Sequence, residues 1–174
     1  VDAMLPYLRE HFGNPSSGHV YGARARAAVV QAREQVAALL GCDADEIVFT
    51  SGGTEANNLA IRGVTEALER KSHVVTTIIE HPATARPCAW LEKHERSVTR
   101  IGVDADGRAR VDAAREATDG DTALVTVMHS NNETGVLQPV EELARLAHAA
   151  GALIHTDAAQ SLGKVPVRVR ELDV

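Results

Sequence analysis

Residues 123–157 read ALVTVMHSNNETGVLQPVEELARLAHAAGALIHTD. The stretch opens with a nearly all-apolar run, 123–128, which is typical of a parallel strand covered on both faces. A polar loop follows at 129–135, then a helix expected over 139–150 with proline at its start, then a second strand over 152–156. This order predicts two parallel strands joined by a right-handed crossover.

The same alternation continues toward the N-terminus and predicts an α/β fold of three layers, a mostly parallel sheet flanked by helices. The segment over 22–40 is expected to be an amphipathic helix that stops at Gly41. Turns are expected at 13–18 and 104–107, where glycine, proline, asparagine and aspartate cluster. The other helices are expected over 3–10, 54–69, 82–95 and 111–117, and the other strands over 46–50, 73–79 and 97–103.

The composition excludes several classes of protein. The 174 residues carry 18 Lys+Arg against 24 Asp+Glu without a basic run, so nothing favours binding to nucleic acid or to an anionic membrane surface. No apolar stretch approaches the ~18 residues of a membrane span. Cys42 and Cys88 have no metal-ligand spacing and are too few for a disulfide framework, and no histidines have zinc-site spacing. We expect one soluble, cytoplasmic α/β domain without a metal.

Four polar clusters directly follow expected strands. Because the carboxyl ends of parallel strands meet at one edge of a sheet, where ligands bind, these clusters are expected to converge. Together they offer a phosphate cradle, an imidazole, amide groups and a carboxylate, which suit a phosphorylated pyridine cofactor better than a nucleotide. The clusters are Ser51–Glu55, Glu80–His81, His129–Glu133 and Asp157–Gln160.

The first cluster places Gly53 and Thr54 at the start of an expected helix. Free backbone N–H groups and the positive end of the helix dipole suit a phosphate there. The spacing matches neither the P-loop nor the dinucleotide fingerprint, which argues against ATP and NAD. A glycine turn capped by Thr54, with no ligand, explains the same residues.

The other candidates also have two explanations each. Asp157 follows an apolar strand, where a protonated ring nitrogen could pair with its carboxylate, but it could instead cap a turn. His81 could stack on a flat ligand or move protons, or simply cap a helix. The amide of Asn132 could hold a hydroxyl or carboxylate, or belong to a plain turn. Gln160 could share the face of Asp157 or lie in solvent.

Five segments follow one another along essentially the whole chain. They are GNPSS (13–17) with His19 and Gly22, FTSGGTEANN (49–58), EH (80–81), NNETG (131–135) and HTDAAQ (155–160). Together these segments resemble the cysteine desulfurases, which belong to the class V branch of the fold-type I pyridoxal-phosphate enzymes. Five motifs in the right order are far more specific than any one of them.

The resemblance implies pyridoxal 5'-phosphate as the cofactor and L-cysteine as the substrate. By this likeness, Gly53 and Thr54 hold the cofactor phosphate, His81 stacks on the pyridine ring as a catalytic residue, and Asp157 pairs with the protonated ring nitrogen. That pairing keeps the ring an electron sink.

The resemblance also implies what the remaining residues and partners do. Asn132 and Gln160 would lie near the phenolic oxygen of the cofactor, and Asn132 also near the substrate carboxylate. A cysteine thiolate of the family takes the sulfur as a persulfide, leaves L-alanine, and delivers the sulfur to an acceptor protein, for example in iron–sulfur cluster assembly. Family members are typically homodimers.

Two catalytic groups of the family have no match in this sequence. The family lysine that anchors the cofactor lies in a Ser/Gly-His-Lys motif, and the sulfur-accepting cysteine lies in a later loop. We therefore expect residues 1–174 to be part of the cofactor-binding large domain, without the C-terminal small domain, and inactive alone. The lysines and cysteines that match neither motif are Lys71, Lys93, Lys164, Cys42 and Cys88.

Three alternatives to a cysteine desulfurase remain open. The first is a selenocysteine lyase, because the loop that discriminates the substrate lies outside these residues. The second is a class V aminotransferase or epimerase, which would share the aspartate and the phosphate cradle. The third is a non-catalytic sulfur-transfer scaffold that keeps the fold.

Overall fold

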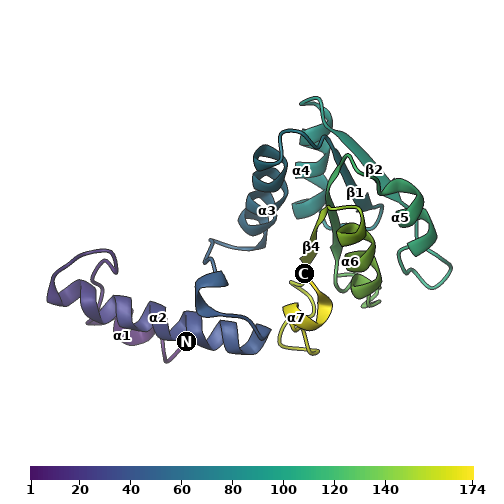
Figure 1. Cartoon of the computed structure of the whole chain (residues 1–174). Coiled ribbons are helices and arrows are strands. Elements are labelled where there is room, and N and C mark those ends of the chain that lie inside the picture. The colour runs from purple at the N-terminus through teal and green to yellow at the C-terminus, as the bar shows by residue number, and fades with distance from the viewer. The chain divides into compact units, whose positions relative to one another are not determined.

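A computed structural model describes residues 1–174 and divides into two compact units, Val1–Val48 and Phe49–Val174 (Figure 1). The first unit contains α1 (Leu5–Arg9), α2 (Val20–Leu40) and the short 3-10 helix η1 (Ala44–Glu46). No helix of either unit is long and apolar enough to cross a membrane.

The start of α2 is fixed by the turn-rich segment 13–18, which packs against it. The helix begins two residues earlier than predicted because His19 Nδ1 accepts a hydrogen bond from the Gly22 N–H at 3.3 Å. A Cβ on Gly22 would lie 2.5 Å from the Ser17 carbonyl oxygen, so only glycine fits this contact. Arg26 donates to the carbonyl oxygens of Pro15 and Ser17. The sequence motif therefore builds a tight loop-to-helix corner.

The end of α2 is as predicted, but its expected amphipathic character is wrong. Gly41 ends the helix in the left-handed conformation at φ 72°. Val29 and Leu39 of this helix are 37% and 53% exposed. Alanines and valines are spread around several sides of this helix, so it has no single apolar face. The residues that are buried are small ones, Gly22, Ala25 and Ala37.

The strand predicted over 46–50 is also wrong. Glu46 belongs to η1, where its Oε2 accepts from the Asp43 N–H at 2.7 Å in a capping box. The β-branched and aromatic residues that follow belong to no strand, and Val48 and Phe49 are 69% and 48% exposed. Strand propensity produces a strand only where a neighbouring strand offers pairing and burial.

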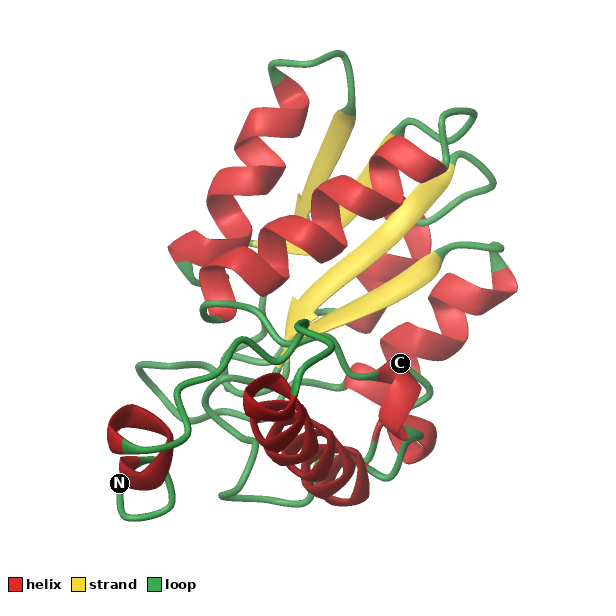
Figure 2. Cartoon of the chain, turned by 90° about the vertical axis from the view of Figure 1, so that its left-hand side faces the viewer, coloured by secondary structure: helices red, strands yellow, loops and turns green.

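The second unit is a parallel sheet of four strands in the order β2-β1-β3-β4, with helices on both faces (Figure 2). This confirms the predicted three-layer α/β fold. Most predicted boundaries lie within three residues of the observed ones, and α7 was not predicted. The strands are β1 (His73–Thr77), β2 (Ser97–Ile101), β3 (Thr122–Met128) and β4 (Leu153–Asp157), and the helices are α3 (Gly53–Ala67), α4 (Pro82–Glu92), α5 (Val111–Ala117), α6 (Val140–Ala149) and α7 (Val169–Leu172).

Two apolar clusters hold the layers together, one on each face of the sheet. Val74 and Leu124 point toward α3 and α4, where they join Ile61, Cys88 and Leu91. The alternate residues Val75, Val125 and Val127 point the other way and join side chains of α5 and α6 such as Ala114, Leu143 and Ala147. Every residue of β1 and β3 is buried, as expected of central parallel strands.

The connections after β1 and β3 leave the sheet in opposite directions. The chain leaves β1 through α4 to reach β2, and it leaves β3 through α6 to reach β4 on the other side. β1 and β3 are neighbours, so their carboxyl ends flank the point at which the strand order reverses. Ligands of open α/β sheets bind at such a point.

Candidate active site

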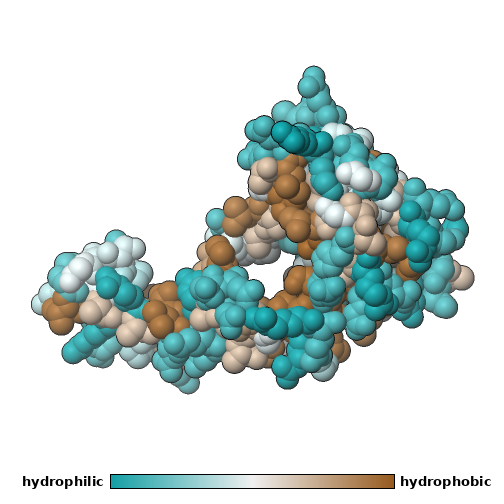
Figure 3. Space-filling view, in the orientation of Figure 1, coloured by the Kyte–Doolittle hydropathy of each residue, from teal (hydrophilic) through white to brown (hydrophobic).

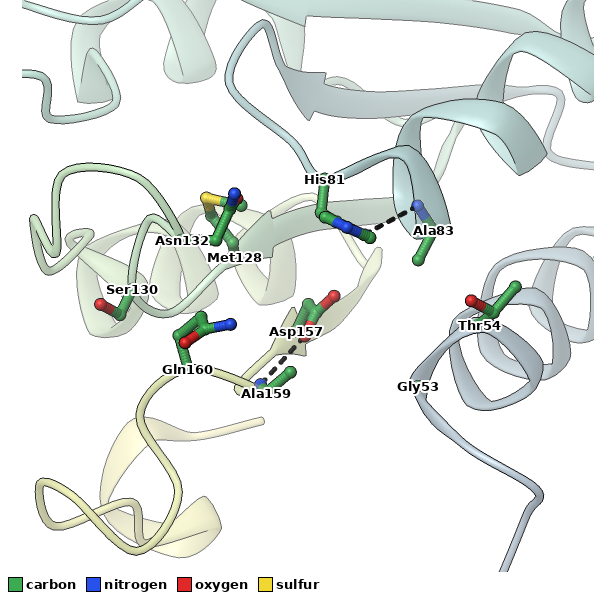
Figure 4. Close-up of a pocket in the computed structure, with 10 residues that line it drawn as sticks. All are labelled: Gly53, Thr54, His81, Ala83, Met128, Ser130, Asn132, Asp157, Ala159 and Gln160. Carbon is green, nitrogen blue, oxygen red and sulfur yellow. Dashed lines mark hydrogen bonds between the residues drawn. The ribbon is translucent and has the colours of Figure 1, made fainter.

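A cavity of about 220 Å³ lies at this carboxyl edge of the sheet (Figure 4). The structure brings together residues from all four polar clusters that follow the predicted strands, including all six candidate site residues. Its lining residues are Gly53, Thr54, His81, Ala83, Met128, Ser130, Asn132, Asp157, Ala159 and Gln160.

The N-terminus of α3 forms one side of the cavity. The N–H groups of Gly53 and Thr54 lie in the first turn, where the helix itself has no carbonyl to accept from them. Ser51, by contrast, is already engaged, because its N–H and its hydroxyl both donate to Glu55 Oε2 at 2.6 and 2.5 Å. These hydrogen bonds lower the pKa of Glu55. The free anion-binding groups are therefore those of Gly53 and Thr54.

His81 both caps a helix and lines the cavity. Its Nδ1 accepts a hydrogen bond from the Ala83 N–H at 3.1 Å, at the start of α4. Because Nδ1 is an acceptor, the proton of the neutral ring lies on Nε2. The cap fixes the ring beside the cavity (Figure 4).

Asp157 ends β4, and each of its carboxylate oxygens has a donor. Oδ1 accepts from the Ala159 N–H at 3.0 Å, and Oδ2 accepts from Asn57 Nδ2 at 2.7 Å. Asn57 Nδ2 also donates to Thr84 Oγ1 at 3.1 Å, and both of these side chains are buried. The turn-cap explanation thus holds for Oδ1, while Asn57 fixes the carboxylate from the other side.

Sequence reasoning gave Asn57 no role of its own. One signal could have found it, because Asn57 lies four residues before the fully buried Ile61 and so shares its face of α3. A buried amide needs polar partners, which α4 and β4 provide here. Those partners are 27 and 100 residues away in sequence, so only the fold reveals them.

Two neighbouring asparagines in the loop after β3 have different roles. Asn131 Oδ1 accepts from the N–H groups of Glu133 and Thr134 at 3.0 and 2.9 Å, which builds the predicted turn. Asn132 lines the cavity instead. Gln160, on the segment after β4, also lines it and accepts at Oε1 from Lys164 Nζ at 3.1 Å.

Glu80 is a buried carboxyl group close to the cavity. Its Oε1 accepts from Thr77 Oγ1 at 2.7 Å and from the Met128 N–H at 3.0 Å. Burial raises the pKa of Glu80 to about 7, and the negative charge of Asp157 adds to that rise. The sequence places Glu80 in one of the polar clusters expected at this edge, with no role of its own.

Cys88 does not have the surroundings of an activated nucleophile. Cys88 is fully buried in α4, and burial raises the pKa of its thiol to about 11. A reactive cysteine needs an exposed site that lowers this pKa. Cys42 lies in the other unit, directly after the end of α2.

Residues 1–174 match the family model described as aminotransferase class V over their whole length. The chain belongs to the class V aminotransferase family. Among curated proteins, the cysteine desulfurase IscS of Dictyoglomus turgidum is 46% identical over 174 residues, which cover 99% of this chain and 44% of that protein. The chain therefore spans less than half the length of this relative.

Two solved structures share this fold closely. A NifS-like protein superposes with a TM-score of 0.96 at 38% identity, covering 99% of this chain and 48% of that one. The structure of SspA in complex with cysteine superposes with a TM-score of 0.94 at 38% identity, covering 99% and 50%.

Membership of the class V family implies pyridoxal 5'-phosphate as the cofactor, and the cavity fits this molecule. Its walls combine apolar atoms of Ala83, Met128 and Ala159 with a few converging polar groups. The start of α3 can accept a phosphate, and the Asp157 carboxylate can accept a protonated ring nitrogen. The start of α3 and the Asp157 carboxylate therefore match the anionic and the cationic part of the cofactor.

Proposed function

We propose that the intact protein is a pyridoxal-phosphate-dependent cysteine desulfurase, which converts L-cysteine to L-alanine and passes the sulfur to an acceptor. One observation carries the proposal: Asp157, held by Asn57 and the Ala159 N–H, shares a cavity with His81 and the N-terminus of α3. The relatives named above support the reaction, since one is a cysteine desulfurase and another was solved with cysteine.

Each residue of the cavity has a task in this proposal. The N–H groups of Gly53 and Thr54 bind the cofactor phosphate with the help of the α3 dipole. His81 stacks on the pyridine ring, held in place by its bond to the Ala83 N–H. Asp157 binds the protonated ring nitrogen through a charge-assisted hydrogen bond.

Asn132 and Gln160 act on the other side of the cavity in this proposal. Both would donate amide hydrogens to the phenolic oxygen of the cofactor, and Asn132 would also bind the substrate carboxylate. When bound, the cofactor supplies an electron sink that stabilises negative charge at the carbon beside the amino group. The protein groups serve to bind, orient and hold protons.

Further parts of the proposal concern the intact protein. We propose that residues 1–174 form part of its cofactor-binding domain and that it works as a cytoplasmic homodimer with a sulfur-acceptor protein as partner. Large apolar side chains reach the surface of the first unit, as the brown areas of Figure 3 show, and such surfaces are typical of interfaces. They include Met4, Leu8, Phe12 and Val20.

Absorption spectroscopy of the intact protein tests the proposed activity. The visible band of the bound cofactor should shift when L-cysteine is added, and, with a thiol reductant present to release the persulfide sulfur, sulfide and alanine should then form in equal amounts. Selenocysteine provides the comparison, and a lower kcat/KM for L-cysteine than for selenocysteine would favour a lyase. Absence of a cofactor band after addition of pyridoxal phosphate would contradict the proposal as a whole.

A further inference from the structure

The pairing of β1 with β3 stops before the carboxyl edge of the sheet. Its last paired residues are Val75 and Val125. By contrast, β1 stays paired with β2 as far as Thr77, and β3 stays paired with β4 as far as Met128. The two central strands therefore lack ladder pairing with each other for their last residues, at the point where the strand order reverses.

The side chain of Glu80 bridges this gap. Its Oε1 accepts from the Thr77 hydroxyl of β1 and from the Met128 N–H of β3. These two donors belong to the strand ends that are not paired with each other. A weaker second link lies beside it, where Asn131 Nδ2 donates to the Ile79 carbonyl oxygen at 3.4 Å. One carboxyl oxygen thus links β1 to β3 where the two strands have no backbone pairing with each other.

The backbone on both sides of this bridge leads directly into the cavity. Glu80 is followed by His81, which caps α4 and lines the cavity, and Met128 lines it from the opposite strand. The Thr77–Glu80 contact spans three residues, so it fixes the whole turn between β1 and His81. The distance between the two sides of the cavity therefore depends on the Glu80 carboxyl.

We propose that Glu80 is a positioning residue for cofactor binding, whose carboxyl group joins the ends of β1 and β3 and so places His81 opposite Met128 and its loop. This inference rests on the proposed function, since it concerns the pyridoxal-phosphate cavity. Glu80 acts through its neighbours, and the cofactor contacts remain those of His81 and the other lining residues.

The surroundings of Glu80 favour its neutral form. Oε2 is buried and has no hydrogen-bond partner, so a negative charge there would be unsolvated. The titratable groups that act on Glu80 or are acted on by it are Asp157 of β4 and the Cys88 thiol of α4, while Arg100 of β2 acts on Cys88. A neutral Glu80 leaves Asp157 as the negative charge available to a cationic ring.

Three variants of the intact protein test the proposal. Glu80→Met keeps the length of the side chain but removes the acceptor, whereas Glu80→Gln keeps a carbonyl oxygen where Oε1 lies. Glu142→Gln, an exposed glutamate of α6, is the matched control. Two readouts are needed: the Kd for pyridoxal phosphate added back to protein freed of cofactor, and amide hydrogen exchange around Met128.

The proposal predicts a specific order among these variants. Glu80→Met should raise the Kd by about tenfold or more, because two hydrogen bonds to the carboxyl are lost. It should also speed exchange at Met128 more than in α6 or β2. Glu80→Gln should restore both readouts to within about threefold of the wild type, because the carbonyl acceptor is kept.

Two results would overturn the proposal in distinguishable ways. If the wild type binds cofactor and Glu80→Met has the same Kd and the same Met128 exchange, Glu80 does not position the cavity. The same conclusion follows if Glu80→Met speeds exchange equally everywhere, since that is a general loss of stability. If the wild type itself binds no pyridoxal phosphate, the proposed function fails, and the cofactor role of Glu80 fails with it.

Discussion

His81 and Asp157 each use one atom to hold nearby backbone and still face the cavity. His81 Nδ1 accepts from the Ala83 N–H, and Asp157 Oδ1 accepts from the Ala159 N–H. Such second contacts restrict rotation of the side chain before any ligand arrives, which lowers the entropy cost of binding. Capping and ligand binding are therefore compatible tasks for these two residues.

Asp157→Asn tests whether the negative charge of Asp157 is needed. The asparagine keeps the size of the side chain, so the fold should persist, but the ring nitrogen would lose its charged partner. Loss of one partner from a desolvated charge pair costs about 3 kcal/mol, so kcat/KM for L-cysteine should fall about 100-fold. Steady-state kinetics on the intact protein measures this.

Asp106→Asn is the matched control for this change, because Asp106 is an exposed carboxylate in the turn before α5. It should retain the wild-type kcat/KM. Wild-type kinetics in Asp157→Asn would contradict the role proposed for Asp157, provided that both variants melt at similar temperatures.

Glu80 should make stability fall as the pH rises. Its pKa is about 7 in the fold against 4.5 as the ordinary value, so the folded state binds the extra proton between these values. The contribution is fully present below pH 4.5 and is lost as the pH rises through 7. From pH 5 to pH 8, the free energy of unfolding of the wild type should fall by about 2 to 3 kcal/mol relative to that of Glu80→Gln, whose amide cannot titrate.

Chemical denaturation at several pH values measures this difference between the two proteins. Other groups, such as the partly buried His155, whose pKa is lowered by desolvation, titrate in both proteins and cancel in the difference. The free energy of unfolding of Glu142→Gln should change with pH as that of the wild type does. A constant difference between wild type and Glu80→Gln across this range would mean that Glu80 titrates as an ordinary carboxyl.

The sequence predicted which residues meet at the cavity better than it predicted what holds them. Gly53, His81 and Asp157 line the cavity, and each lies next to a strand end or a helix start. The hydrophobic pattern of the sequence predicts where strands end and helices begin. Asn57 was missed because its partner Asp157 is 100 residues away. Contacts of this kind depend on which helix covers which strand, and periodicity does not specify that.

At the scale of single elements, two glycines should respond to alanine in opposite ways. A Cβ on Gly22 would lie 2.5 Å from the Ser17 carbonyl oxygen and 2.6 Å from that of Asn14. Gly22→Ala should therefore destabilise the corner between the 13–18 segment and α2 by about 1 to 3 kcal/mol, as overpacking does.

Gly63→Ala is the matched control, because Gly63 lies inside α3 and a Cβ there meets nothing within 4 Å. This change should stabilise the protein by about 0.5 to 1 kcal/mol, since alanine favours helix over glycine. Amide hydrogen exchange in α2 reports the effect of Gly22→Ala, and thermal melting reports the effect of Gly63→Ala. Equal effects would mean that the corner at Gly22 relaxes without cost.

The elements that sequence analysis predicted correctly are those with strong local signals. β3 is a long apolar run, and α6 follows a proline with acidic residues in its first turn. The strand expected over 46–50 failed because propensity cannot supply a pairing partner. The α7 helix was missed because its four residues are too short to show a period.

At the scale of the whole molecule, the two units differ sharply in what they bury. The apolar clusters on both faces of the sheet belong to the second unit. In the first unit the buried apolar residues are Ala25 and Ala37, whereas Val30 and Leu39 are 47% and 53% exposed. Because burial of apolar surface is the main stabilising term, residues 1–48 have little stability of their own.

Hydrogen exchange of the 174-residue chain should therefore separate the two units. A lone helix of this length is marginal in water, so amides of α2 should exchange about 100-fold faster than amides of β3, whose exchange requires opening of the sheet. A shortened chain of residues 49–174 is the control and should keep the β3 protection, since both apolar clusters lie within it. If α2 and β3 instead exchange at one rate, the chain unfolds as a single cooperative body, and α2 draws its stability from contacts beyond those of its own unit.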